Sequence, residues 1–217
     1  MNESQEVLNT LKKVEAIITN SHIVYTSGKH GNTYINEDMI YLHTEEISKL
    51  CQLIAQKFVD DNVEVVIAPA IRGVILSQWV AYHLTKITGK EVLSVYAEKS
   101  NDGDTFIIKR GYDKFVTGKN VLVVEDVLTT GDSARKVVEA TRSIGGNVIG
   151  LGVLCNRGYV TPHDVADVPR LCELLKIHLN DWEEDKCPLC AENVPINTNV
   201  GEGRQYLDRK EKEKEKK

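Results

Sequence analysis

The chain has 217 residues, of which 41% are hydrophobic and 27% are charged, and its formal net charge is −5. This length predicts one domain with additions and a core of useful size. The negative charge, with no basic face outside the extreme C-terminus, excludes nucleic acid as the default partner. No apolar run approaches the ~18 residues that a membrane span needs, and the polar N-terminus is unlike a signal peptide.

The cysteines indicate the redox setting. They form an odd set of five without the close spacing of a small, disulfide-rich secreted domain. We therefore expect a reducing, cytoplasmic environment. The five are Cys51, Cys155, Cys172, Cys187 and Cys190.

The first third of the chain alternates helical and β-prone segments. Apolar residues recur at helical spacing over residues 3–19 and again over residues 44–60, and each segment predicts a helix with one charged face. Between them, residues 22–38 predict two β-prone pieces around a turn at residues 27–31. Cys51 falls on the apolar stripe of the second helix and is most simply a core residue.

The next segments place polar loops after predicted strands. Residues 64–73 predict a short strand and a Pro-containing loop that ends in Arg72 and Gly73, before a helix over residues 74–85. A strand over residues 91–99 ends in Lys99, followed by a polar, turn-rich loop and a β-prone return. Ligands bind beyond the carboxyl ends of strands in doubly wound sheets, which makes these loops candidate binding segments.

The most informative stretch is residues 121–133, VLVVEDVLTTGDS. Its β-branched run predicts a strand buried on both faces, and an amphipathic helix follows from Ser133. Backbone N–H groups, the helix N-terminus and the side-chain hydroxyls of the intervening loop together suit a phosphate. The acidic pair Glu125–Asp126 would repel a phosphate, so it is expected to face sugar hydroxyls or a metal.

Two further strands complete the predicted sheet, over residues 147–155 and 171–179. Arg157 lies just past the end of the first of them and should lie over the same sheet edge as the other loops. This alternation of strands and helices predicts an α/β fold, with a parallel sheet flanked by helices. The first forty residues and the C-terminal segment are expected to form a small hood over it.

The C-terminal part contains a Cys-Pro-Leu-Cys element at Cys187 and Cys190. This spacing is typical of a zinc knuckle, but a structural zinc needs four ligands, and nearby only Cys172 and His178 are candidates to complete the set. Reduced structural thiols are the simplest interpretation, and redox use is a third. Residues 1–208 are assigned to one domain, and the charge run over residues 209–217 is expected to be disordered.

Residues 121–133 resemble the thirteen-residue signature of phosphoribosyltransferases that use phosphoribosyl pyrophosphate (PRPP). In that family the acidic pair holds the ribose hydroxyls and the following loop holds the 5-phosphate. The resemblance extends to the loop at Arg72, which matches the pyrophosphate loop and would contain a cis peptide between Ala70 and Ile71. The implied PRPP-binding residues are Arg72, Gly73, Lys99, Glu125, Asp126, Val127, Leu128, Thr129, Thr130, Gly131, Asp132 and Ser133, with Lys99, Glu125 and Asp126 as the catalytic candidates.

The string SGKHGNTYIN at residues 27–36 resembles the base-binding segment of orotate phosphoribosyltransferases. The resemblance implies a base site containing Lys29, Tyr34, Ile35 and Thr129, with Arg157 pairing the carboxylate of orotate. It covers about residues 20–160 in four separate segments. Three departures stand out: Arg72 replaces the usual lysine, the loop after Lys99 lacks the lysines of better-studied members, and the Cys-Pro-Leu-Cys element is additional.

The resemblance implies Mg²⁺-dependent transfer of ribose 5-phosphate from PRPP to a base, most simply orotate, in pyrimidine nucleotide synthesis. It also implies a homodimer. Thr129 stands where enzymes acting on hypoxanthine and guanine carry an aspartate, which disfavours a 6-oxopurine. Three alternatives remain open: a phosphoribosyltransferase for another base, a regulator that binds PRPP without catalysis, and a zinc-dependent interaction module.

Overall fold

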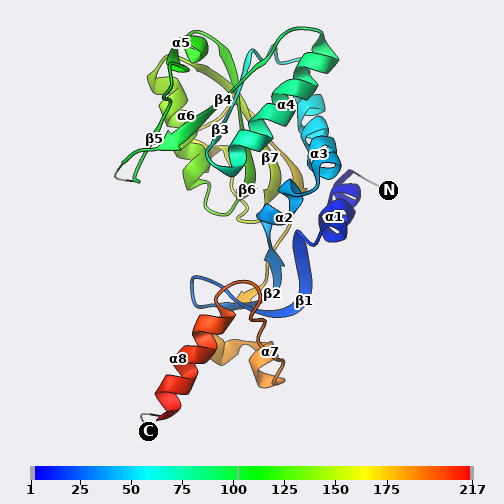
Figure 1. Ribbon diagram of the computed structural model, residues 1–217, viewed down its shortest axis with the longest axis vertical. Helices are drawn as coiled ribbons and strands as arrows, with labels where there is room; N and C mark the ends of the chain where they lie inside the picture. The colour runs from blue at the N-terminus through cyan, green and yellow to red at the C-terminus, as the bar shows by residue number, and fades with distance from the viewer. Residues whose placement is uncertain (1–2, 102, 216–217) are drawn as a thin grey trace.

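The computed structural model describes residues 3–101 and 103–215, and its main body is built on a six-stranded sheet (Figure 1). The strand order is β5-β4-β3-β6-β7-β8; every neighbouring pair is parallel except β4 and β5. The predicted parallel α/β sheet is confirmed, with one antiparallel edge strand added. The strands are β3 (Val65–Pro69), β4 (Leu93–Lys99), β5 (Phe106–Ile107), β6 (Asn120–Leu128), β7 (Asn147–Asn156) and β8 (Leu171–Lys176).

Helices cover both faces of this sheet, which is why its central strands are apolar throughout. In β6, Leu122 and Val124 point to the face packed by α3 and α4, whereas Val121 and Val123 point to the face packed by α6. The helices of the main body are α1 (Glu3–Lys13), α2 (Glu37–Tyr41), α3 (Thr44–Lys57), α4 (Arg72–Thr88), α5 (Asp113–Val116) and α6 (Asp132–Ser143), with a 3₁₀ turn, η1 (Pro162–Val165).

A hood is present at the far end of the molecule from α5 (Figure 1), but it contains less of the first forty residues than expected, because α1 and α2 pack on the main body. It contains a small antiparallel sheet in the order β1-β2-β9, to which both ends of the chain contribute. Its elements are β1 (Ile17–Val24), β2 (His30–Ile35), β9 (Asp181–Trp182), η2 (Glu184–Lys186), α7 (Pro188–Ala191) and α8 (Gly203–Glu215). Among the helices of residues 3–101 and 103–215, none combines the length and apolar character needed to cross a membrane.

The first helix is shorter than the predicted range of residues 3–19. The helix ends at Lys13, and Glu15 takes a positive φ of 56° that turns the chain. Ile17 and Ile18 then pair with Ile35 and Tyr34 as the start of β1. The β-branched side chains of Ile17 and Ile18 suit a strand. Their positions happen to continue the helical spacing of the apolar residues before them, which is why the predicted helix included them.

The prediction of a disordered tail from residue 209 is wrong for residues 209–215, which belong to α8. Lysine and glutamate are good helix formers, and alternating them allows stabilising pairs one turn apart. Lys210 also forms an ion pair with Glu184 (Nζ to Oε1, 2.7 Å), which anchors the helix to the hood. Residues 216–217 lie outside the described residues.

The zinc ligands proposed to complete the cysteine pair are wrong. Cys172 lies in β8 of the main sheet, opposite Gly152, and His178 packs against the ring of Tyr159. β8 ends at Lys176, so Cys172 lies within the main sheet and His178 lies beyond it. Cys187 and Cys190 instead face two histidines of the β1–β2 hairpin, at positions 22 and 30.

Candidate active site

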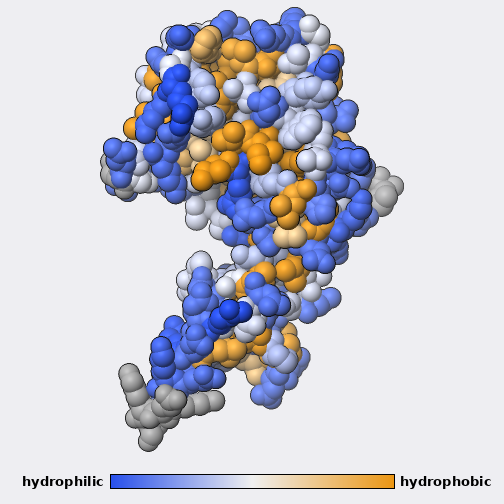
Figure 2. Space-filling model, viewed as in Figure 1, coloured by the Kyte–Doolittle hydropathy of each residue, from blue (hydrophilic) through white to orange (hydrophobic). Residues whose placement is uncertain are grey.

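Two neighbouring cavities open at the carboxyl edge of the main sheet. The Arg72 cavity, of about 460 Å³, is lined by Arg72, Lys99, Asp126 and Ser133 among others. The Arg157 cavity, of about 540 Å³, has walls from both the main body and the hood. They adjoin, because the consecutive residues Glu37 and Asp38 line one each. In Figure 2 the surface is hollowed between the main body and the hood.

The acidic pair at the end of β6 is almost fully buried, with Glu125 and Asp126 exposing 7% and 5% of their surface. Asp126 Oδ2 lies 3.2 Å from Arg72 Nε and accepts a hydrogen bond of 3.2 Å from the Tyr41 hydroxyl. Burial and the Asp126 charge raise the pKa of Tyr41, so this hydroxyl stays protonated and donates. The predicted neighbourhood of the acidic pair and Arg72 is therefore present, and both line one cavity.

Glu125 is the member of the pair whose ionised form is disfavoured by its surroundings. Its Oε1 accepts the backbone N–H of Asp126 at 3.2 Å, but burial and the adjacent Asp126 carboxylate raise its pKa well above 4.5. Its side chain lines the Arg72 cavity. A carboxylate that costs stability in the free protein, yet faces a cavity, is typical of a functional site.

Glu125→Gln is expected to raise the unfolding free energy of the ligand-free protein by about 1 kcal/mol at neutral pH, because it removes a poorly solvated charge. The folded pKa exceeds the unfolded value of 4.5, so the contribution of Glu125 to stability is complete below that pH and is lost as pH rises through the folded pKa. The advantage of the variant should therefore grow with pH. Urea unfolding of both proteins from about pH 5 to about pH 8 tests this, and a variant less stable throughout would contradict it.

The loop after the acidic pair joins β6 to the N-terminus of α6. Gly131 is the N-cap of the helix and has a φ of 79°, a conformation that favours glycine. A Cβ there would also lie 2.9 Å from Val160 and Val165. The helix begins at Asp132, and Thr130 Oγ1 accepts the Asp132 N–H at 3.3 Å. The loop thus presents hydroxyls and the first N–H groups of a 12-residue helix, an arrangement suited to an anion.

The remaining residues of the predicted loop form contacts within the protein that hold the loop in place. The Asp132 carboxylate pairs with Arg135 at 2.6 Å and Lys136 at 2.7 Å, so two cations of its own helix neutralise it. The carbonyl oxygen of Leu128 accepts the N–H groups of Arg157 and Gly158, at 3.0 and 3.1 Å. These bonds join the loop after β6 to the loop after β7. Val127 is half-buried between Asp126 and Leu128.

The loop after β3 contains the expected cis peptide between Ala70 and Ile71. Arg72 opens α4 directly after it and lies 3.2 Å from Asp38 as well as from Asp126. Gly73 sits against the strand, where a Cβ would approach Ala68 Cβ to 2.6 Å. Arg72 is therefore a cation at the cavity wall, held by carboxylates that an incoming anionic group could replace.

Lys99, the last residue of β4, also lines the Arg72 cavity. Two other basic residues, Lys109 and Arg110, follow this loop in the chain, and both pair with Glu98, at 3.8 and 2.7 Å. Lys99 is therefore the candidate cation of this loop on the cavity side, as the sequence analysis predicted. Residue 102, within the same loop, lies outside the described residues.

The Arg157 cavity contains most of the predicted base-binding set. Tyr34, Ile35, Thr129 and Arg157 line it, and Arg157 Nε donates to Thr129 Oγ1 at 2.8 Å. Lys29 is not among its lining residues; its ammonium lies 3.1 Å from the carboxylate of Asp181, which does line the cavity.

Several site residues were missed by the sequence analysis. They are Tyr25 and Glu37 in the Arg157 cavity, Asp38 in the Arg72 cavity, and Tyr41 beside Asp126. Burial raises the pKa of Glu37, as it does that of Glu125. The signal available in the sequence was the acidic pair Glu37–Asp38 directly after the base-binding string. It opens the five-residue helix α2, which brings it to Arg72.

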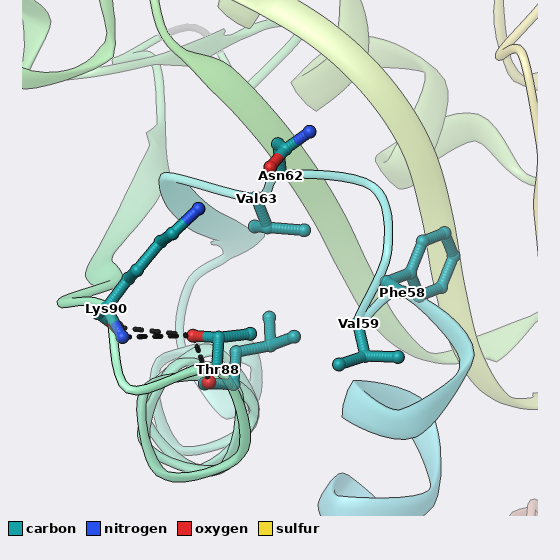
Figure 3. A pocket seen from close by; sticks show the side chains of 7 residues that line it. Phe58, Val59, Asn62, Val63, Thr88 and Lys90 are labelled. Atoms are coloured by element: carbon teal, nitrogen blue, oxygen red, sulfur yellow. Dashed lines mark hydrogen bonds between the residues drawn. The ribbon is translucent and has the colours of Figure 1, made fainter.

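A third cavity, of about 240 Å³, lies between the C-terminal ends of α3 and α4 (Figure 3). It is lined mainly by Phe58, Val59, Val63 and Thr88, at the opposite edge of the sheet, where β3 begins. The Thr88 hydroxyl bonds its own helix end, to the Leu84 carbonyl at 2.8 Å and the Lys90 N–H at 3.2 Å. Its lining residues include no cluster of reactive groups, so we assign it no catalytic or binding role.

Comparisons with known proteins agree with this geometry. The family model described as phosphoribosyl transferase domain matches residues 38–189. The orotate phosphoribosyltransferase of Caldanaerobacter subterraneus is 33% identical over 199 residues, covering 89% of this chain and 95% of that protein. A crystal structure of Mycobacterium tuberculosis orotate phosphoribosyltransferase superposes with a TM-score of 0.66 at 20% identity, covering 81% of this chain and 96% of that one.

Another structure of the M. tuberculosis enzyme, in complex with PRPP, superposes with a TM-score of 0.61 at 19% identity, covering 81% of this chain and 96% of that one. At these identities the structures show a shared fold. The sequence comparisons show the family as well as the fold. The relative from C. subterraneus is more than 30% identical over most of the chain, and the family model matches residues 38–189. The chain therefore belongs to the orotate phosphoribosyltransferase family and carries a phosphoribosyltransferase domain.

Proposed function

We propose that this protein transfers ribose 5-phosphate from PRPP to orotate, which gives orotidine 5′-monophosphate and pyrophosphate in pyrimidine nucleotide synthesis. The observation that carries the proposal is the buried pair Glu125–Asp126 at the end of β6, which leads directly to a hydroxyl-lined helix N-terminus. Cations line the same cavity, and a second cavity with an arginine adjoins it. The Arg72 cavity therefore offers groups for the ribose, the 5-phosphate and the pyrophosphate of PRPP, and the Arg157 cavity offers a place for the base.

We assign each site residue to the part of PRPP whose charge or hydrogen-bonding groups complement its own. Glu125 and Asp126 accept hydrogen bonds from the ribose hydroxyls, and residues 128–133 donate N–H and O–H groups to the 5-phosphate. Arg72 and Lys99 neutralise the departing pyrophosphate. Breaking the anomeric C–O bond builds positive charge on the sugar ring, and the nearby carboxylates stabilise it. The chain thus contributes mainly positioning and electrostatic stabilisation, with little proton transfer.

Arg157 is assigned to the orotate carboxylate. A guanidinium pairs with a carboxylate through two parallel hydrogen bonds, which a neutral purine cannot reproduce. In the free protein it bonds the Thr129 hydroxyl and lines the base-sized cavity with Tyr34 and Ile35. Thr129 carries no charge that would select a 6-oxopurine.

Mg²⁺ is proposed to arrive with PRPP. It prefers oxygen ligands and is held in proteins by one or two carboxylates together with substrate phosphates. The Arg72 cavity fits this, because Asp38, Glu125 and Asp126 all contribute carboxylates to its lining. When bound, the ion supplies further neutralisation of the pyrophosphate charge. A homodimer and a cytoplasmic location complete the proposal by family resemblance.

The test is pyrophosphate release from PRPP and Mg²⁺ with one base at a time. Orotate should support turnover, whereas adenine and xanthine should give rates at least about 100-fold lower, because neither offers a carboxylate to Arg157. Turnover with a purine alone would assign the enzyme to another base. PRPP binding without pyrophosphate release for any base would instead indicate a regulator.

A further inference from the structure

Four metal-binding side chains meet inside the hood, away from both active-site cavities. His22 lies in β1 and His30 in β2, whereas Cys187 and Cys190 flank the start of α7, more than 150 residues later. One ligand atom from each lies within 4.8 Å of every other. His22, His30 and Cys187 are buried and Cys190 is half-buried. Figure 1 shows α7 close to the β1–β2 hairpin.

The separations match those around a tetrahedral zinc ion. With Zn–N near 2.0–2.1 Å and Zn–S near 2.3 Å, tetrahedral geometry separates nitrogen from sulfur by about 3.6 Å and nitrogen from nitrogen by about 3.4 Å. His22 Nε2 lies 3.6 Å from both Cys187 Sγ and Cys190 Sγ, and His30 Nδ1 lies 3.3 Å from Cys190 Sγ. The two histidine nitrogens are somewhat closer, at 2.8 Å.

The surroundings prepare His22 for this role. Its Nδ1 lies 2.7 Å from the carbonyl oxygen of Val194, which can only accept, so Nδ1 carries the proton. The lone pair of the neutral ring is then on Nε2, the atom that faces the two sulfurs. A ligating histidine whose other nitrogen donates to a backbone carbonyl is the usual arrangement in zinc sites.

We propose that His22, His30, Cys187 and Cys190 bind one structural Zn²⁺. Four protein ligands close the coordination shell, which distinguishes a structural site from a catalytic one with an open position. Two thiolates balance the charge of the ion, so the assembled site is neutral and suits burial. A disulfide between the cysteines would account for neither the convergence of the histidines on the sulfurs nor the orientation of His22.

The ion would fasten the C-terminal segment to the β1–β2 hairpin. Without an ion, β2 and β9 pair over two residues, His22 bridges Ile196, and backbone hydrogen bonds from Asn197 and Glu202 reach β1. Both segments also form a wall of the Arg157 cavity, through Tyr25 from the hairpin and Glu202 from the C-terminal segment. Zinc in the hood would therefore hold that cavity in shape from outside it.

The first experiment is metal analysis of the full, tag-free chain purified without chelator. We expect about one zinc per chain, and less than about 0.1 in Cys190→Ser and in His30→Ala. Cys172→Ser is the matched control, because it removes a cysteine of the main sheet and should keep its zinc. Zinc-free wild-type protein that takes up none when refolded with Zn²⁺, or a Cys187–Cys190 disulfide in purified protein, would overturn the proposal.

A second readout covers the case in which the variants fail to fold. Wild-type protein refolded with Co²⁺ should show the absorption bands of a tetrahedral cobalt–thiolate centre, and Cys172→Ser should show the same bands. Cobalt bound without these bands would contradict the assigned ligands. Neither readout involves turnover, so the zinc site and the proposed reaction stand or fall separately.

Discussion

Asp126→Asn is expected to lower kcat/KM for PRPP by about 10² to 10³-fold. The substitution weakens hydrogen bonds between a charged acceptor and the ribose hydroxyls, each worth about 1.5–3 kcal/mol, and it takes a carboxylate partner from Arg72. An Asn side chain keeps the shape, so the fold should persist. Steady-state kinetics with PRPP varied at saturating orotate measures the effect.

Asp61→Asn is the matched control for this measurement. Asp61 is also paired with an arginine, Arg170, at 2.8 Å (Oδ2 to Nη1), but the pair joins the turn after α3 to the residue before β8, near the opposite edge of the sheet. Its kcat/KM should stay within about twofold of wild type, because surface pairs contribute little. An Asp126→Asn enzyme as active as this control would remove the acidic pair from the mechanism.

Arg157→Ala should raise KM for orotate by about 100-fold and leave KM for PRPP within about twofold. The loss corresponds to about 2.7 kcal/mol, the scale of a charge-assisted pair between a guanidinium and a carboxylate. Arg157→Lys should recover only part of it, because an ammonium lacks the planar fork. Initial rates over a grid of orotate and PRPP concentrations separate the two KM values.

Arg170→Ala provides the comparison for Arg157. This arginine lies over the ring of Phe58 and pairs with Asp61, so its loss should lower the unfolding temperature while both KM values stay unchanged. Equal increases of both KM values in Arg157→Ala would mean that the arginine merely supports the loops. Its bond to Thr129 allows that outcome, which is why the split between the two substrates is decisive.

The sheet and its central site were predictable from the sequence because their signals are local. Residues 121–124 are apolar on both faces, and the acidic pair, the turn and the helix follow within a single stretch. Carboxyl ends of parallel strands meet at one edge, so Arg72, Lys99 and Arg157 could be brought together on topology alone. The structure places all three at that edge, in the two cavities.

The features that were missed depend on contacts across the chain. His30 falls within the turn predicted over residues 27–31, yet it is fully buried against Cys190, 160 residues away. Proximity in the sequence suggested Cys172 as a partner for the cysteine pair, but no local pattern indicates that Cys172 lies in β8 of the main sheet, away from the hood. The helix over residues 209–215 was hidden by composition, because a lysine–glutamate repeat is compatible with disorder until an anchor such as Glu184 holds it.

A crystal structure of the protein with PRPP, Mg²⁺ and orotate bound would test all of the proposed residue roles at once. We expect the 5-phosphate on the N–H groups of residues 129–133, the ribose hydroxyls on Glu125 and Asp126, and the pyrophosphate beside Arg72 and Lys99. The orotate carboxylate should lie on Arg157. A 5-phosphate bound away from residues 129–133, or ribose hydroxyls out of reach of the buried carboxylates, would contradict it.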